Sequence, residues 1–182
     1  MIIAVAGRRI DAPEAKEKRF PLENILFVKD SINKVFQNSG AKILISSGAC
    51  GADLIAMKAA NESGLECYMV LPFDEENFKR ISVTDRPGDW QLIYDPLIEK
   101  LKVNERLIIL NYSTDDPLAF EKTNTVILDK AYELSVKRSE AVMVLIVWDG
   151  IAKNENDTTL HFKNEALKRS FMVNEIKTIH HG

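Results

Sequence analysis

Short apolar runs alternate with segments of helical periodicity along almost the whole chain, and this alternation restricts the fold more than any other feature. Uninterrupted apolar runs are typical of strands that are buried on both faces, as in a parallel sheet covered by helices. We expect strands at 2–6, 42–46, 66–71, 107–110, 141–148 and 172–176. We expect helices at about 22–37, 52–63, 75–81, 90–101, 118–137 and 158–169. The pattern predicts an α/β protein with a doubly wound, mostly parallel sheet of about six strands.

Length and composition favour a single domain at residues 1–178, followed by a tail at 179–182 that contains His180 and His181. A net charge of −3 provides no attraction to nucleic acid or to an anionic membrane, so we expect neither as a partner. No apolar run approaches the roughly 20 residues that span a bilayer. The two cysteines, Cys50 and Cys67, form no disulfide framework, which favours a cytoplasmic protein. We expect no cofactor and, since no ligand spacing is present, no metal.

A glycine-rich turn joins the second expected strand to the next helix, in the sequence Ser46-Ser47-Gly48-Ala49-Cys50-Gly51-Ala52-Asp53. Such a turn leaves backbone N–H groups free at the helix N-terminus, where phosphate or carboxylate is favoured. The spacing of Gly48, Gly51 and Asp53 matches neither a Walker loop nor a dinucleotide fingerprint. A tight turn with Asp53 as a helix cap would explain the same residues. The helix N-terminus should also lower the pKa of Cys50, although no partner for a nucleophile is evident.

The chain resembles the SLOG class of nucleotide-binding proteins, which groups DNA-processing protein A with the cytokinin-activating phosphoribohydrolases. The resemblance covers the first half of the chain, at residues 5–9, 45–53 and 70–73. It implies a Rossmann-like three-layer fold, frequently in a homodimer, with a pocket for a nucleotide or a phosphorylated nucleoside. In this first half, the residues that the resemblance and the turn assign to ligand binding are Gly7, Arg8, Ser47, Gly48, Ala49, Gly51, Ala52, Asp53 and Pro72.

The second half departs from the phosphoribohydrolases, which carry Pro-Gly-Gly-x-Gly-Thr-x-x-Glu after a late strand. This sequence has Asp149-Gly150, a polar insertion, and then Asp157-Thr158-Thr159 at the start of a helix that contains Glu165. The catalytic glutamate therefore has no direct counterpart, and Glu165, Asp149 and Asp157 are the candidate acids. Gly150, Thr158 and Thr159 are candidate ligand contacts, because threonine hydroxyls can donate to a phosphate. An N-cap role explains the two threonines equally well.

Other polar residues complete the expected site. Arg8 and Arg9 follow the first strand, and Arg86 lies in a turn-rich segment beside Trp90. A guanidinium group binds phosphate bidentately and keeps its charge, although each arginine alone could be an ordinary surface residue. Asn124 could reach a ribose or a base, or could simply face solvent.

We therefore expect a module that binds or senses a nucleotide-derived ligand. One alternative is an N-glycosidic hydrolase or transferase, in which carboxylates stabilise an oxocarbenium-like transition state. A second alternative is single-stranded DNA binding, which the lack of a basic face disfavours. A homodimer is expected through helices that flank the pocket, on the apolar spacing of Val126, Ile127, Lys130, Ala131 and Leu134.

Overall fold

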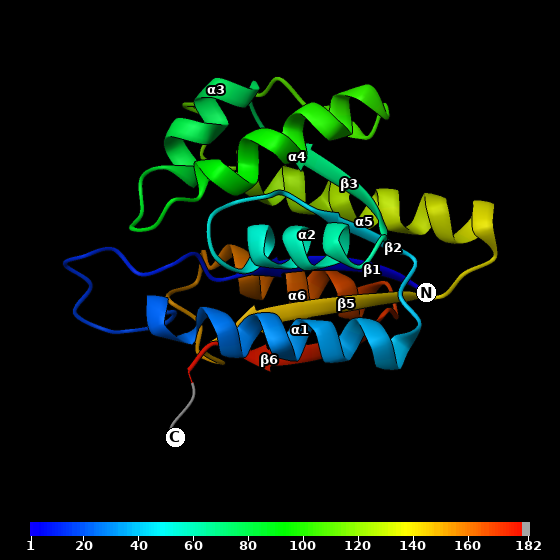
Figure 1. The fold of residues 1–182 in the computed structure, drawn as a ribbon, viewed down its shortest axis with the longest axis horizontal. Helices are drawn as coiled ribbons and strands as arrows, with labels where there is room; N and C mark the ends of the chain where they lie inside the picture. The colour runs from blue at the N-terminus through cyan, green and yellow to red at the C-terminus, as the bar shows by residue number, and fades with distance from the viewer. Residues whose placement is uncertain (180–182) are drawn as a thin grey trace.

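The computed structural model describes residues 1–179, and one sheet of six strands forms its centre (Figure 1). The strands are β1 (Ile2–Gly7), β2 (Ile43–Ser46), β3 (Glu66–Leu71), β4 (Leu107–Ile109), β5 (Val142–Trp148) and β6 (Met172–Lys177). They lie in the order β4-β3-β2-β1-β5-β6, and each neighbouring pair is parallel. The predicted α/β class is confirmed, with a sheet that is parallel throughout. His180 and His181 lie outside the described residues.

Helices cover both faces of this sheet, which gives the three layers of a Rossmann-like fold. One face carries α1 (Ile25–Ser39), α2 (Ala52–Glu62) and α4 (Gln91–Val103), and the other carries α5 (Ala119–Arg138) and α6 (Thr158–Lys168). Figure 1 shows α1 and α2 in front of the sheet and α6 behind it. The connection from β3 to α4 contains the short α3 (Glu75–Phe78) and a π-helix, η2 (Lys79–Val83).

Burial on both faces explains why the central strands are almost entirely apolar, whereas the edge strand β6 also contains Asn174 and Glu175. In β1, Ile3 and Val5 belong to the core under α1 and α2, whereas Ile2 and Ala4 belong to the core under α5 and α6. Alternate residues of a strand point to opposite faces, so two covered faces demand an apolar residue at every position.

The predicted strands agree with the observed ones to within one residue at each end. The helices differ more at their ends. The first begins with a 3-10 turn, η1 (Leu22–Asn24), and the expected helix at 75–81 is divided between α3 and η2. Gly40 ends α1 in the left-handed conformation, with φ of 60°, which is common for glycine at the end of a helix.

The order of the strands creates a crevice next to β1. From β1 the chain runs outward through β2, β3 and β4, and α5 then carries it back so that β5 pairs with the other side of β1. The point between β1 and β5 is thus a topological switch point, where open parallel sheets leave room for a ligand at the carboxyl ends of their strands. Strands β1, β2 and β5 all end at this edge, so the segments that follow them begin here.

The apolar spacing on α5 reflects packing within the chain. Ile127, Ala131 and Leu134 are buried against the sheet, and Lys130 forms an ion pair with Glu133. The expected homodimer stays a prediction. Over residues 1–179, no helix combines the length and the hydropathy that crossing a membrane would require.

Candidate functional site

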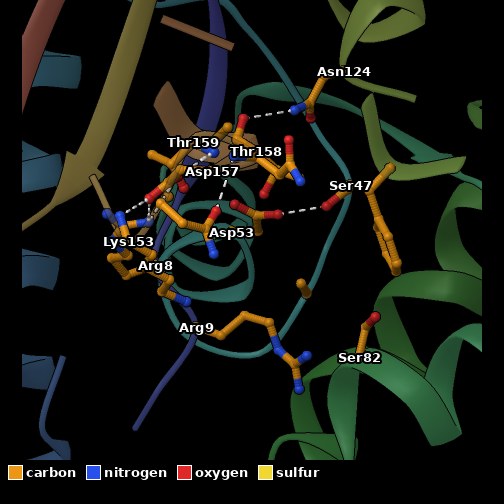
Figure 2. A pocket seen from close by; sticks show the side chains of 16 residues that line it. Arg8, Arg9, Ser47, Asp53, Ser82, Asn124, Lys153, Asp157, Thr158 and Thr159 are labelled. Atoms are coloured by element: carbon orange, nitrogen blue, oxygen red, sulfur yellow. Dashed lines mark hydrogen bonds and ion pairs between the residues drawn. The ribbon is translucent and has the colours of Figure 1, made fainter. Parts of the chain in front are cut away.

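A pocket of about 320 Å³ lies at the switch point, on the carboxyl edge of the sheet. Known small-molecule sites begin at about 300 Å³. The lining residues come from five parts of the chain: Ala6, Gly7, Arg8 and Arg9 at the end of β1; Ser47, Ala49 and Asp53 from the glycine-rich turn and α2; Ser82 from η2; Phe120 and Asn124 from α5; Lys153, Asn154, Asn156, Asp157, Thr158 and Thr159 after β5 (Figure 2). Segments far apart in the sequence thus meet at one cavity.

The glycine-rich turn and the segment after β1, which the sequence assigns to one ligand site, are in contact. The backbone N–H of Ala52 donates to the carbonyl oxygen of Arg8 at 3.1 Å. Gly51 has φ of 95°, and a Cβ there would lie 2.7 Å from that same oxygen. Only glycine fits, because the two backbones approach this closely and because φ is positive. Gly48 has φ of 78° and faces the side chain of Met69.

Neither glycine lines the pocket, so their role in the structure is to shape the turn. The N–H groups of Ala52 and Leu54 at the start of α2 are also engaged, with the carbonyl oxygens of Arg8 and Ala49. The helix N-terminus therefore offers a ligand fewer backbone donors than the sequence suggests.

Arg8 forms a buried ion-pair cluster with carboxylates of the loop after β5. Its Nε donates to Asp149 Oδ1 at 2.9 Å, and its Nη1 lies 2.7 Å from Asp157 Oδ2. The Arg8 side chain is only 2% exposed, and Arg19 adds a second cation at 2.6 Å from Asp149. We call these four residues the Arg8 cluster. Because protein carboxylates occupy Nε and Nη1, and Nη2 donates to the carbonyl oxygen of Ile151, Arg8 holds the loop after β5 against β1.

Asp157 links this cluster to α6. Its Oδ1 accepts hydrogen bonds from the backbone N–H groups of Thr159, at 2.9 Å, and Leu160, at 3.1 Å. Burial alone would raise the pKa of Asp157, but hydrogen bonds from the Lys153 backbone N–H and from Arg8 outweigh it and hold the pKa below its ordinary value. Asp157 is therefore the N-cap of α6, and its carboxylate is committed to structure.

The two threonines and Asn124 lie together on the same side of the pocket. Thr158 and Thr159 are the first residues of α6, and the side-chain amide of Asn124 donates to the Thr158 carbonyl oxygen at 3.0 Å. This bond joins α5 to α6 across the pocket wall, as the dashed line in Figure 2 shows.

Asp53 is the most unusual residue of the site. It is 6% exposed, and Ser47 Oγ donates to its Oδ2 at 2.5 Å, whereas its Oδ1 has no hydrogen-bond partner among the described residues. Gly51 holds the N-cap position of α2, so Asp53 is not the cap residue that one interpretation expects. Burial raises the pKa of Asp53 to about 6, although the hydrogen bond from Ser47 partly opposes this effect.

Ser82 is a second buried polar group without a partner at this pocket. It is 1% exposed, its Oγ makes no hydrogen bond within the described part of the chain, and it belongs to the π-helix η2. π-helical turns frequently mark functional sites. Buried polar atoms are nearly always paired in proteins, so two unpaired ones at a single cavity make it a candidate site for a polar ligand.

Two cations border the pocket. Arg9 pairs with Asp85, and its Nε lies 3.5 Å from the Cys50 sulfur. Lys153 stands in the loop after β5, where partial loss of water around its ammonium group and repulsion from Arg8 lower the pKa of Lys153. Both side chains carry positive charge at neutral pH and face a cavity with little other free charge.

Burial raises the pKa of the Cys50 thiol, and nearby Arg9 opposes this only in part. The expectation that the helix N-terminus lowers this pKa is therefore wrong, because Cys50 is completely buried and loses the solvation of its thiolate.

Several expected site residues lie outside the lining of the pocket. Glu165 is near the end of α6 and pairs with Lys168 at 2.6 Å, and Arg86 pairs with Asp85. The remaining ones are Gly48, Gly51, Ala52, Pro72, Asp149 and Gly150. Conversely, the sequence did not indicate the lining residues Ser82, Phe120, Lys153, Asn154 and Asn156. For Lys153, Asn154 and Asn156 the one available signal was that segment 149–157 follows the carboxyl end of a strand.

Within residues 1–179, no group of three or more histidine, cysteine, aspartate or glutamate side chains has the arrangement of a metal site. The polar groups at the pocket are instead hydroxyls, amides, one free carboxylate oxygen and two cations. This mixture can bind a ligand that carries both an anion and hydrogen-bond donors.

No protein-family model matches the sequence, and no curated protein matches it either. Among solved structures, DNA processing protein A from Streptococcus pneumoniae is similar over 94% of this chain, at 14% identity and a TM-score of 0.39. This chain spans 57% of the length of that chain. The molybdenum cofactor carrier protein from Chlamydomonas reinhardtii is similar over 97% of this chain and 91% of its own, at 16% identity and a TM-score of 0.33. At this similarity both likenesses concern the fold alone.

Proposed function

We propose that the protein binds a phosphorylated nucleoside in the switch-point pocket. The observation that carries this proposal is the pair of buried, unpartnered polar atoms, Asp53 Oδ1 and Ser82 Oγ, in one cavity with the cations Arg9 and Lys153. Leaving a buried polar group unpaired costs about 1–3 kcal/mol, so a ligand that pairs both groups recovers that free energy.

The phosphate of such a ligand belongs near Lys153 and Arg9. Lys153 is the better anchor, because the charge of Arg9 is already shared with Asp85. The hydroxyl of Thr158 and the amide groups of Asn154 and Asn156 line the same side of the pocket as Lys153 and supply neutral hydrogen-bond groups. Phe120 lines the pocket from α5 and offers an aromatic face or edge to a base.

The three candidate acids are all held in ion pairs, which favours binding over N-glycosidic hydrolysis. Asp149 and Asp157 are held by the Arg8 cluster, and Glu165 pairs with Lys168 away from the cavity. A general acid must exchange a proton with the substrate, which a carboxylate locked in a buried ion pair does poorly. DNA binding is disfavoured because the net charge is −3 and the cations Lys153 and Arg9 sit at a cavity of about 320 Å³.

Isothermal titration calorimetry with adenosine 5′-monophosphate, ribose 5-phosphate and inorganic phosphate tests the proposal. We expect binding of the nucleotide, weaker binding of the sugar phosphate, and loss of about tenfold or more in affinity in Lys153→Ala, since a charge-assisted hydrogen bond contributes about 1.5–3 kcal/mol. Lys168→Ala is the matched control, because Lys168 is an exposed residue of α6 that pairs with Glu165 outside the pocket.

Two results would contradict the proposal. One is the absence of binding for all three compounds, and the other is equal affinity in the Lys153→Ala and Lys168→Ala variants. A chromatographic assay for free adenine in the same samples separates binding from hydrolysis. Release of adenine by the native protein would favour the hydrolase alternative.

A further inference from the structure

The pocket contains a carboxylate, Asp53, of which only one oxygen has a hydrogen-bond partner among the described residues. Asp53 Oδ2 accepts a hydrogen bond from Ser47, whereas Asp53 Oδ1 has no partner within the described residues, although Asp53 is only 6% exposed. Figure 2 shows the Asp53 carboxyl group near the centre of the pocket, linked to Ser47 and with the other lining side chains around it. A free carboxylate oxygen at this position accepts hydrogen bonds and donates none when ionised.

The charge of Asp53 determines which part of a ligand approaches it. A phosphate group would be repelled by the carboxylate and attracted by Lys153 and Arg9. A neutral group with a polar hydrogen would be attracted instead. The part of a phosphorylated nucleoside that supplies such hydrogens within a few ångströms of its phosphate is the ribose, through its 2′- and 3′-hydroxyls.

We propose that Asp53 selects ribose-containing ligands by accepting a hydrogen bond from a ribose hydroxyl through Oδ1. This inference rests on the proposed function and adds the sugar specificity of the same site. Ser47 is a positioning residue, because its hydrogen bond to Oδ2 orients the carboxylate so that Oδ1 stays free.

The protonation of Asp53 should therefore control the discrimination between sugars. Burial raises the pKa of Asp53 to about 6, so the carboxylate is ionised at pH 7.5 and largely protonated at pH 5. The other charged groups that line the pocket are Arg8 and Arg9 after β1, and Lys153 and Asp157 after β5. The lining residues from α5 and η2, among them Ser82, are uncharged. Arg8 and Asp157 neutralise one another, and Arg9 is paired with Asp85, so Lys153 is the charged lining residue for which no ion pair has been described.

The test compares adenosine 5′-monophosphate with its 2′-deoxy and 3′-deoxy forms by calorimetry between pH 5 and pH 7.5. All three carry the same phosphate, so its ionisation cancels in the ratio of dissociation constants. At pH 7.5 we expect at least one deoxy form to bind roughly 10- to 100-fold more weakly, the range for hydrogen bonds to charged groups. The ratio should fall toward one as the pH drops through about 6.

Two variants separate recognition from a structural role. In Asp53→Asn the ratio at pH 7.5 should be smaller than in the native protein and should not change with pH, because a neutral amide oxygen accepts a weaker hydrogen bond than a carboxylate. Affinity for the deoxy form should stay near that of the native protein. In Ser47→Ala the midpoint of the pH profile should move upward, because the Ser47 hydrogen bond lowers the pKa of Asp53. Asp129→Asn, an exposed residue of α5 that pairs with Arg169, is the matched control and should leave the ratio unchanged.

Each outcome bears on the inference. If the nucleotide binds but both deoxy forms bind equally well at pH 7.5, the sugar specificity is wrong while the proposed function stands. If the ratio in Asp53→Asn keeps both the size and the pH dependence that it has in the native protein, a different residue binds the hydroxyl. If no nucleotide binds at all, the proposed function fails, and the inference fails with it.

Discussion

Replacing Asp53 with asparagine should make the protein more stable at neutral pH. Burial raises the pKa of Asp53 from its ordinary 3.8 to about 6, which means that the folded protein disfavours the ionised carboxylate. One pKa unit corresponds to about 1.4 kcal/mol, so ionisation of Asp53 lowers the unfolding free energy by about 3 kcal/mol above pH 6. Asparagine has nearly the same shape and no charge, and it avoids this loss.

The dependence on pH fixes the sign of the effect. For a carboxyl group whose pKa is raised by folding, the stabilising contribution is complete below the pKa of the unfolded chain, near pH 4. It is lost as the pH rises through the folded-state pKa, near 6. The advantage of Asp53→Asn over the native protein should therefore grow by about 2–3 kcal/mol between pH 4 and pH 7.5.

Urea denaturation followed by circular dichroism at several pH values measures this difference. With a slope near 2 kcal/mol per molar urea, the gain moves the midpoint by about 1 M relative to the native protein. Asp129→Asn removes an exposed carboxylate that pairs with Arg169 and should change stability by at most about 1 kcal/mol at any pH. If the difference between Asp53→Asn and the native protein is the same at pH 4 and pH 7.5, Asp53 is not a buried, poorly compensated carboxylate.

Three further predictions concern the framework of the site. Arg8→Met should lower the unfolding free energy by about 3–5 kcal/mol in chemical denaturation, because it leaves buried carboxylates without a counter-charge. Arg138→Met breaks a more exposed ion pair and should lower it by at most about 1 kcal/mol, so equal losses would disprove the reasoning. Gly51→Ala should lower Tm in calorimetry more than Gly64→Ala. The angle φ is positive at both glycines, but only a Cβ at Gly51 meets backbone atoms. A larger loss for Gly64→Ala would contradict the close approach of Gly51 to the backbone of Arg8. Light scattering at micromolar concentration should give the mass of a homodimer, and a monomer mass would argue against it.

Burial and parallel pairing made the fold accessible from the sequence. The strands could be predicted because residues such as Ile3 and Ala4 face two different cores, which leaves an unbroken apolar run. The neighbourhood of Gly51 and Arg8 followed from the same logic, since adjacent parallel strands end at one edge.

The chemistry of the site was less accessible, because it depends on partners that are distant in the sequence. From the sequence alone, Arg8 is expected to be available to bind a phosphate. In the structure the loop after β5 brings Asp149 and Asp157 onto its guanidinium group. Lys153 stands in a polar segment with no local sign of a cavity. Ser82 faces the pocket from a π-helix, a geometry that periodicity near 3.6 residues does not predict.

The long reach of Arg8 has a consequence for synthesis of the chain. Its two carboxylate partners follow 141 and 149 residues later. At about 5–20 residues per second, a ribosome needs on the order of ten seconds to produce them. During that interval β1 and the glycine-rich turn are complete, but their arginine is without its counter-charges and one wall of the pocket does not yet exist. A nascent chain therefore contains β1 to β4 before its site is complete, and the pocket can form only after β5 and the segment that follows it have emerged.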